Sequence, residues 1–348
     1  MGKEDTGVSN LGDLAEELSL SISTVSRALA GKPNVTEETR RRVLEAAERL
    51  GYAANRSGRS LRSGMTGTVT FILSPHPQFQ YAEPFFMPLL GGLQEALAER
   101  SLDLTVALGR PGAAQVDQIR QLVESRSTDA VLLAWTQPND PRIAWLIAAG
   151  VPFAALGRSE GLPPFPSLDI DFDVLGQEAA ARLIGEGHRR LALVNAPADL
   201  NFHAYLERGF RRGLAAHGIP PEQMVLREDP MTEDGAHRLM QALLATPTPP
   251  TGMLLCGETM LAGAWRAFAE AGLRPGIDIS VIMATDSPLC SFLSPRVTSF
   301  QAPLRELGSR LVEILMQAMP GYAGPEGRRC VQELVMLPLV ARESDGPA

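Results

Sequence analysis

Residues 14–27 read LAEELSLSISTVSR, which has the spacing of two short helices around a tight turn. Ser19 and Leu20 fill the turn, and Ser21 can cap the second helix by accepting an amide hydrogen bond. The face of the second helix opposite its apolar side carries hydroxyl side chains, one isoleucine and one arginine. Such a face suits the major groove of DNA. Apolar residues repeat at helical spacing on both sides of the turn and predict its packed face: Leu14, Ala15, Leu18, Val25, Ala28 and Leu29.

A third helix is predicted to begin after Thr36, a typical capping residue, and to end before Gly51. Val43, Ala47 and Leu50 share one face of this helix and can close the core over the first two helices. The N-terminal part of the chain is therefore predicted to be a three-helix helix-turn-helix module.

Positive charge is concentrated in this module. From Arg27 to Arg62 there are nine lysines and arginines against four acids, a local balance of +5, whereas the whole chain carries −8. A solvated helix face would explain the run Arg40–Arg42 equally well if it stood alone. With a helix-turn-helix directly upstream, the charge indicates a surface for DNA phosphates.

Residues 24–64, TVSRALAGKPNVTEETRRRVLEAAERLGYAANRSGRSLRSG, resemble the DNA-binding headpiece of the LacI (lactose repressor) family. The resemblance implies that Ile22, Ser23 and Arg27 contact base edges. It also implies a hinge helix in the minor groove, in which Arg59 participates and Leu61 acts as an apolar wedge. Further DNA contacts, mostly to phosphate or sugar, are implied for Ser21, Thr24, Ser26, Asn34, Tyr52 and Asn55.

Two departures from the family pattern bear on this module. Ser19 stands where a turn glycine is usual, and Gly58 lies inside the hinge. A glycine costs a helix about 1 kcal/mol relative to alanine, so we expect the hinge to depend more strongly on DNA for its folding.

Composition excludes several classes of protein. No apolar run reaches the length of a membrane span and the N-terminus is polar, so we expect a cytoplasmic protein without a signal peptide. Cys256, Cys290 and Cys330 are far apart and odd in number, which indicates reduced thiols. The five histidines lack metal-ligand spacing, and we expect neither a metal nor a cofactor.

After residue 66, short apolar runs alternate with helix-length amphipathic ones. This alternation predicts an α/β fold with parallel sheets covered on both faces, and its two successive series predict two lobes. The predicted strands are TVTFIL, DLTVAL, AVLLAW and PFAAL in the first series, and RLALVN, MVLRED, GMLLCG, ISVIMA and VTSF in the second.

The family resemblance extends to this body and implies the fold of periplasmic sugar-binding proteins, with three chain crossovers between the lobes. We expect a DNA-binding domain at 1–55, a hinge at 56–66, and a ligand-binding and dimerisation domain at 67–348. Within that domain we expect lobe 1 at about 67–166 and 302–325, including a helix near Leu304–Met319. Lobe 2 is expected at about 167–300 and 330–342, including a final strand near Val331–Val340.

Ligands of open parallel sheets bind at the carboxyl ends of the strands, so two facing lobes predict a ligand cleft. The loop at residues 74–88 is aromatic with one acid, which suits a sugar ring, and Phe79, Tyr81 and Glu83 are its best candidates. Phe85 is a weaker candidate, and Phe86 is expected in the core of the following helix.

Other ligand candidates follow strands or correspond to cleft positions of the family: Arg110, Arg158, Glu258, Asp286 and Gln301. Leu206, Gly257 and Thr285 depart from the family pattern and remove a guanidinium and two polar groups. Either the ligand is unusual, or His203, Tyr205 and Arg208 compensate; the sequence leaves both possibilities open.

Together these features predict a dimeric repressor that leaves a near-palindromic operator when a carbohydrate-like effector binds; a corepressor-dependent regulator remains open. The body alone would also suit a solute-binding protein for transport. An enzyme is not expected. Residues 157–161, GRSEG, match the nucleophile-elbow pattern, but LPPFP follows and cannot form the required helix.

Overall fold

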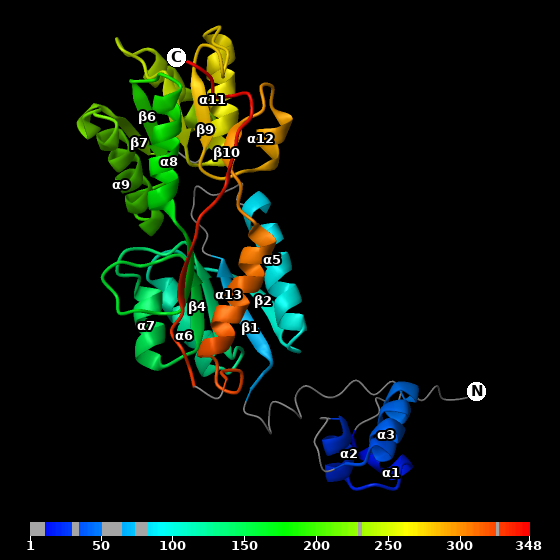
Figure 1. The fold of residues 1–348 in the computed structure, drawn as a ribbon. Helices are drawn as coiled ribbons and strands as arrows, with labels where there is room; N and C mark the ends of the chain where they lie inside the picture. The colour runs from blue at the N-terminus through cyan, green and yellow to red at the C-terminus, as the bar shows by residue number, and fades with distance from the viewer. Residues whose placement is uncertain (1–10, 30–34, 51–64, 74–82, 229–231, 325–326) are drawn as a thin grey trace. The chain divides into compact units, whose positions relative to one another are not determined.

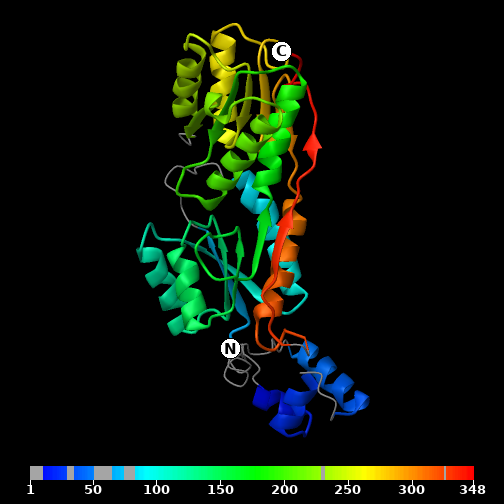
Figure 2. The ribbon, with the colours of Figure 1, turned by 60° about the vertical axis from the view of Figure 1, so that its left-hand side comes forward.

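The chain folds into two compact units, Met1–Gly67 and Thr68–Ala348. The computed structural model describes residues 11–29, 35–50, 65–73, 83–228, 232–324 and 327–348. Figures 1 and 2 show its helices and strands from two directions.

The described residues of the first unit form three short helices: α1 (Leu11–Glu17), α2 (Ile22–Leu29) and α3 (Glu37–Arg49). Ser21 caps α2 by accepting the amide hydrogen of Thr24 at 3.1 Å, and Thr36 caps α3 by accepting that of Thr39 at 3.3 Å. The predicted apolar face forms the core, since Leu14, Val25 and Val43 are fully buried there and join Ala15, Ala28, Ala46 and Ala47. The predicted helix-turn-helix is confirmed.

The first lobe of the second unit is built on a six-stranded parallel sheet with the order β11-β5-β4-β3-β1-β2. Its strands are β1 (Thr68–Leu73), β2 (Asp103–Leu108), β3 (Ala130–Ala134), β4 (Phe153–Leu156), β5 (Ser167–Ile170) and β11 (Gln332–Val335). Helices α5 (Glu83–Ala98) and α13 (Leu304–Ala318) pack together on this sheet, and α6 (Ala114–Glu124) contacts α7 (Pro141–Ala149) (Figure 1).

The second lobe has a similar sheet with the order β12-β10-β9-β8-β6-β7, in which only β12 runs antiparallel. Its strands are β6 (Leu191–Asn195), β7 (Val225–Glu228), β8 (Gly252–Leu255), β9 (Ser280–Met283), β10 (Thr298–Phe300) and β12 (Leu339–Val340). Its helices are α8 (Phe172–Gly185), α9 (Asn201–Ala216), a single 3₁₀ turn at Pro221–Gln223, α10 (Glu233–Leu244), α11 (Glu258–Glu270) and α12 (Pro288–Phe292).

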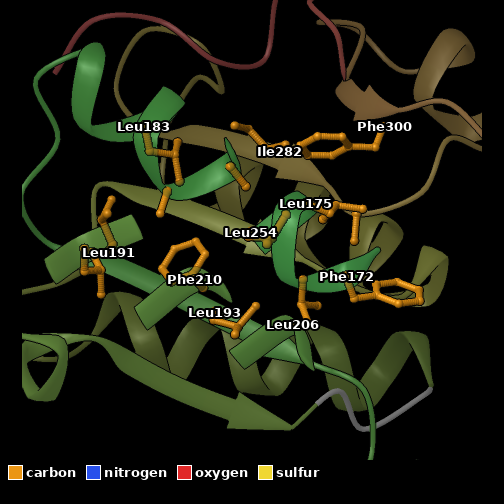
Figure 3. Close-up of a cluster of buried hydrophobic side chains, with 14 of the residues drawn as sticks. Phe172, Leu175, Leu183, Leu191, Leu193, Leu206, Phe210, Leu254, Ile282 and Phe300 are labelled. Atoms are coloured by element: carbon orange, nitrogen blue, oxygen red, sulfur yellow. The ribbon is translucent and has the colours of Figure 1, made fainter. Parts of the chain in front are cut away.

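The central strands of the second lobe are buried on both faces, as their continuous apolar runs predict. Alternate residues point to opposite sides, so Leu193 joins the cluster under α8 and α9 while Val194 joins the cluster under α10 and α11. Figure 3 shows the first of these clusters, where Leu183, Phe210 and Leu254 bring together α8, α9 and the sheet. The first of these clusters fixes α9 on the sheet of the second lobe through Tyr205, Leu206, Phe210 and Leu214.

The chain passes between the lobes three times: between β5 and α8, between β10 and α13, and between β11 and β12. Two details of the expected boundaries are wrong. Ser167–Ile170 forms β5 of the first sheet, because it pairs with β4 on one side and β11 on the other. The expected final strand at Val331–Val340 is divided, so that only Leu339–Val340 belongs to the second sheet.

Candidate functional site

The exposed face of α2 is the candidate DNA-reading surface. Ile22 is 53% exposed and Ser23 and Arg27 are also exposed, while Val25 and Ala28 on the other side are buried in the core. The Ser21 hydroxyl lies 2.9 Å from that of Ser23 and 2.8 Å from that of Thr24. The helix therefore presents hydroxyls, one aliphatic side chain and one guanidinium that the core does not use.

The arginines of α3 are partly neutralised by acids. Arg40 pairs with Glu37 at 2.8 Å and Arg41 lies 3.8 Å from Glu45. Arg49 pairs with Glu17 of α1, which ties the third helix to the first. Helix α2 contains no acidic residue, and Arg27 is its one charged side chain. The positive charge of the reading face on α2 therefore comes from Arg27. Thr24 and Ser26 are half-buried on α2, and the other predicted DNA contacts lie outside the described residues: Asn34, Tyr52, Asn55, Arg59 and Leu61.

In the second unit, Arg158 lies just after β4, where the sequence placed it, and is held by a neighbouring strand. Its Nε and its backbone N both donate to Oδ2 of Asp169 in β5, at 2.8 and 3.2 Å. Burial raises the pKa of Asp169, and the charge of Arg158 opposes the rise. The Nη2 atom of Arg158 is buried without a hydrogen-bond partner among the residues that the structure describes.

The guanidinium of Arg158 lies across the lobe boundary on the ring of Tyr205 in α9, with its central carbon 3.8 Å from the ring centroid. Arg208, one turn further along α9, lies 4.8 Å from the same centroid. Arg208 in turn pairs with Asp173 of α8 and approaches Glu160 of the first lobe at 3.6 Å. Two cations and three carboxylates are therefore gathered around one buried aromatic ring.

Asn201, the first residue of α9, also joins the two lobes. Its backbone N donates to the carbonyl oxygen of Thr136 at 2.8 Å, and its Nδ2 donates to that of Arg158 at 2.9 Å. Its Oδ1 accepts the backbone N–H of Glu160 at 3.4 Å. All three contacts end on loops that follow β3 and β4, so the start of α9 is bound to the carboxyl edge of the first sheet.

His203, Tyr205 and Arg208 were suggested as substitutes for the guanidinium that is missing at Leu206. Two of them reach the lobe boundary and one does not. Leu206 itself is fully buried in the core under α8 and α9. Tyr205 and Arg208 meet Arg158 as described. His203 points instead to its own lobe, where its Nδ1 lies 2.6 Å from the carbonyl oxygen of Ala196.

Other ligand candidates are engaged differently. Asp286 forms an ion pair with Arg342 and accepts the hydroxyl of Ser299 at 2.7 Å. Burial acts to raise the pKa of Asp286, but these hydrogen bonds outweigh it and lower the pKa below its usual range. Glu258 begins α11, and burial raises its pKa against a hydrogen bond from Ser287. The structure thus gives Asp286 a structural partner and leaves Glu258 half-buried.

Arg110 and Gln301 are exposed, and each donates through its backbone N–H, Arg110 to Oε1 of Gln118 and Gln301 to the carbonyl oxygen of Pro338. Phe85, expected in a loop at residues 74–88, lies inside α5, and its ring meets that of Phe86 edge-on at 5.2 Å. Phe86 is buried against Trp135 and Phe71, so its expected place in the core is confirmed. Phe79, Tyr81 and the side chain of Glu83 lie outside the described residues.

Sequence reasoning missed several polar residues of this cluster: Thr136, Glu160, Asp169, Asp173 and Asn201. Asp169 was overlooked because its strand was assigned to the other lobe. Asn201 lies at the start of its helix, where an asparagine resembles an ordinary cap. One sequence feature could have indicated two of these residues. Thr136 and Glu160 closely follow predicted strands of a parallel sheet, where ligand-binding residues usually lie.

The geometry around Ser159 does not form a nucleophile elbow. Its hydroxyl donates to the carbonyl oxygen of Gln137 at 2.6 Å and accepts the backbone N–H of Asp140 at 3.1 Å, and the serine is buried. Within the described part of the chain, no cluster of three or more His, Cys, Asp or Glu side chains could hold a metal ion. No described helix has the length and apolar character needed to cross a membrane.

Comparison with known proteins agrees with both halves of the structure. Residues 10–55 match the family described as bacterial regulatory proteins, lacI family, and residues 162–344 match the periplasmic binding protein-like domain. The chain is 37% identical to the HTH-type transcriptional regulator AglR of Rhizobium meliloti (strain 1021), over 97% of this chain and 95% of that protein.

Two solved structures extend the comparison. A complex of the transcriptional regulator CelR with cellobiose aligns with a TM-score of 0.73 and 28% identity, covering 97% of this chain and 99% of that one. A lac repressor dimer bound to operator and the anti-inducer ONPF aligns with a TM-score of 0.82 over 98% and 100% of the two chains; at 23% identity it shows a shared fold. The chain belongs to the LacI family and is a helix-turn-helix transcriptional regulator.

Proposed function

We propose that this regulator represses transcription as a homodimer on a near-palindromic operator and leaves it when a small carbohydrate binds between the lobes of the second unit. The observation that carries the proposal is the meeting of Arg158, Tyr205 and Asn201 across the lobe boundary. A ligand there contacts both lobes at once, so it can change their relative position.

On DNA, Ile22, Ser23 and Arg27 of each α2 read base edges in the major groove. The exposure of these side chains, together with the capped and well-packed helix beneath them, supports this role. Phosphate and sugar contacts come from Ser21, Thr24, Ser26, Asn34, Tyr52 and Asn55, and the hinge residues Arg59 and Leu61 enter the minor groove.

The dimer uses the edge of the first sheet that ends in β2. Leu108 is 71% exposed and Val106 is exposed beside it, and Met87 is exposed on α5, which packs against β2. An exposed apolar edge strand is a surface that proteins normally cover. A second copy of this chain is the occupant that a palindromic operator requires, because each half-site needs one recognition helix.

The effector is a carbohydrate-like molecule. The site offers an N–H donor of Arg158 without a hydrogen-bond partner among the described residues, and carboxylates able to accept hydroxyl protons. The cellobiose complex of CelR supports this choice, since that regulator shares the fold over almost the whole chain. The ligand shifts the operator equilibrium only to the extent that it binds one lobe arrangement more tightly than the other.

The reading face is tested with footprinting on the DNA that adjoins the gene, comparing the wild type with Arg27→Ala. We expect Arg27→Ala to weaken specific binding by about tenfold or more, since one bidentate base contact contributes about 1–3 kcal/mol. Arg41→Ala is the matched control. Arg41 is also an exposed arginine, but it lies on α3, where it pairs with Glu45 of the same helix. Equal specific binding by wild type and Arg27→Ala would refute the assigned reading face.

A further inference from the structure

The proposed effector site holds two guanidinium groups, and a structure with such groups could be selective for charged sugars. Each guanidinium, however, already has a carboxylate of the chain beside it. Arg158 pairs with Asp169 at 2.8 Å, and Arg208 pairs with Asp173 and lies 3.6 Å from Glu160. With all five groups ionised, the cluster carries one net negative charge.

Helix N-termini are the other places where proteins bind anions, through free backbone N–H groups. At α8 the side chain of Asp171 occupies this position by accepting the N–H of Val174 at 3.3 Å. At α9 the first N–H, that of Asn201, donates to the carbonyl oxygen of Thr136. The N-terminal turn of α11 carries its own acid, Glu258.

The faces of the aromatic ring are also engaged. Both guanidinium groups lie within 4.8 Å of the centroid of Tyr205, which is buried. The ring is therefore a support for the two cations. What the cluster has left for a ligand is Nη2 of Arg158, which has no hydrogen-bond partner among the described residues, Nη1 of Arg208, which lies 3.6 Å from Glu160, and the lone pairs of its carboxylates.

We infer that the interlobe site takes an uncharged polyhydroxylated ligand and rejects phosphorylated and carboxylated sugars. A hydroxyl group can accept from Nη2 of Arg158 and donate to a carboxylate, whereas a phosphate oxygen only accepts. A phosphate would also enter a cluster of net negative charge in which both cations are already paired. Asp169, Asp173 and Glu160 are therefore specificity-determining residues, an inference that rests on the proposed function of the site.

The first test is calorimetry on the full-length protein with cellobiose, maltose, sucrose and trehalose, each beside its 6-phosphate. We expect the disaccharide that binds most tightly to lose about tenfold or more in affinity when it is phosphorylated. A 6-phosphate that binds more tightly than its parent sugar would overturn the inference. If that 6-phosphate also releases the operator, only the inference about ligand charge fails, and the proposed function as an effector-controlled regulator is retained. A failure of the proposed DNA-reading face would appear separately, in the Arg27→Ala footprint.

The second test converts the site. The double variant Glu160→Gln/Asp173→Asn frees Arg208 from both carboxylates, and we expect it to bind the same 6-phosphate about tenfold more tightly than the wild type does. Glu160→Gln alone, at a half-exposed position, should show part of this gain with the fold unaffected. Asp278→Asn is the matched control, because it frees Arg274 from an exposed ion pair elsewhere on the second lobe. Equal phosphate affinity in the double variant and this control would contradict the inference.

Discussion

Arg158 of the first lobe rests its guanidinium on the ring of Tyr205 of the second, at 3.8 Å from the ring centroid. Each partner is fixed within its own lobe, Arg158 by Asp169 and Tyr205 by the core under α8 and α9. Because neither side chain is free to follow the other, any rotation of the lobes must break this contact.

The contact predicts different outcomes for two substitutions of Tyr205. Tyr205→Leu removes the aromatic face and should lower the free energy of unfolding by about 2 kcal/mol, the strength of a desolvated cation–π contact. Tyr205→Phe keeps the ring and should cost less than about 1 kcal/mol. Urea unfolding of both variants measures the difference, and equal losses would show that the ring face contributes nothing.

Asn201 predicts an effect on coupling between the lobes. Asn201→Ala removes the hydrogen bonds to the Arg158 carbonyl and the Glu160 amide, at a cost of about 1–3 kcal/mol because Asn201 is buried. We expect the variant to change the concentration of sugar that releases the operator, as measured by gel shift.

The matched control is Asn195→Ala. Asn195 is also a buried asparagine, but the hydrogen bonds of its side-chain amide stay within the second lobe, with the backbone of His203 and Ala196. Both variants should lose stability, and Asn201→Ala alone should alter effector release. A similar change in Asn195→Ala would mean that lost stability, and not the interlobe contact, explains the effect.

The sequence predicted most of the strands, though not β5, together with the helices and the place of Arg158, because these follow from local patterns. The run of apolar residues in each strand is set by burial on both faces, and a polar residue just after a strand lies at the ligand-binding edge. The partners of Arg158 could not be predicted in the same way. Asp169 and Tyr205 reach it through strand order and lobe packing, which depend on contacts between distant parts of the chain.

The same limit explains the division of the last strand. Residues 331–340, VQELVMLPLV, are mostly apolar, and their local break signal, Pro338, does not indicate that the two parts join different sheets. Asp286 illustrates the converse. Its position after β9 suggested a ligand contact, but Arg342, which is 56 residues away in sequence, takes both of its carboxylate oxygens.

The turn of the helix-turn-helix contains a strained residue. Ser19 has a φ of +54°, a left-handed conformation that costs a residue with a Cβ about 1–2 kcal/mol. Ser19→Gly removes this cost and adds some unfolded-state entropy, so we expect a net gain of about 0.5 kcal/mol in the stability of the headpiece. Ser19→Val should be destabilising. Thermal unfolding of the three proteins ranks them, and a valine variant as stable as the glycine variant would contradict this account.

The exposed edge at β2 predicts the state of assembly. Leu108→Asp places a charge on the proposed dimer surface and should weaken self-association by about tenfold or more, as measured by sedimentation velocity across a concentration series. Met336→Asp is the matched control, since Met336 is also 71% exposed but follows β11 at the opposite edge of the same sheet. Dissociation by Met336→Asp with no effect of Leu108→Asp would assign the dimer to the other edge.

The C-terminal tail predicts a pH dependence of stability. Gly346 docks on the second lobe, where its carbonyl oxygen lies 3.0 Å from Nε2 of His188 and accepts the hydroxyl of Ser280 at 2.9 Å. Burial lowers the pKa of His188 from its ordinary value of 6.5, despite the hydrogen bond to Gly346 that opposes the shift. The folded protein therefore binds fewer protons at His188 than the unfolded chain does, just below pH 6.5.

The stability contributed by a neutral His188 is complete above pH 6.5 and falls as the pH drops toward the lowered pKa of the folded state. In urea unfolding between pH 8 and pH 5, the advantage of the wild type over His188→Gln should shrink as the pH falls. Ser280→Ala removes a hydrogen bond to the same carbonyl without removing a titrating group, so its deficit should stay constant across that range. A constant deficit for His188→Gln as well would show that docking of the tail does not depend on a neutral histidine.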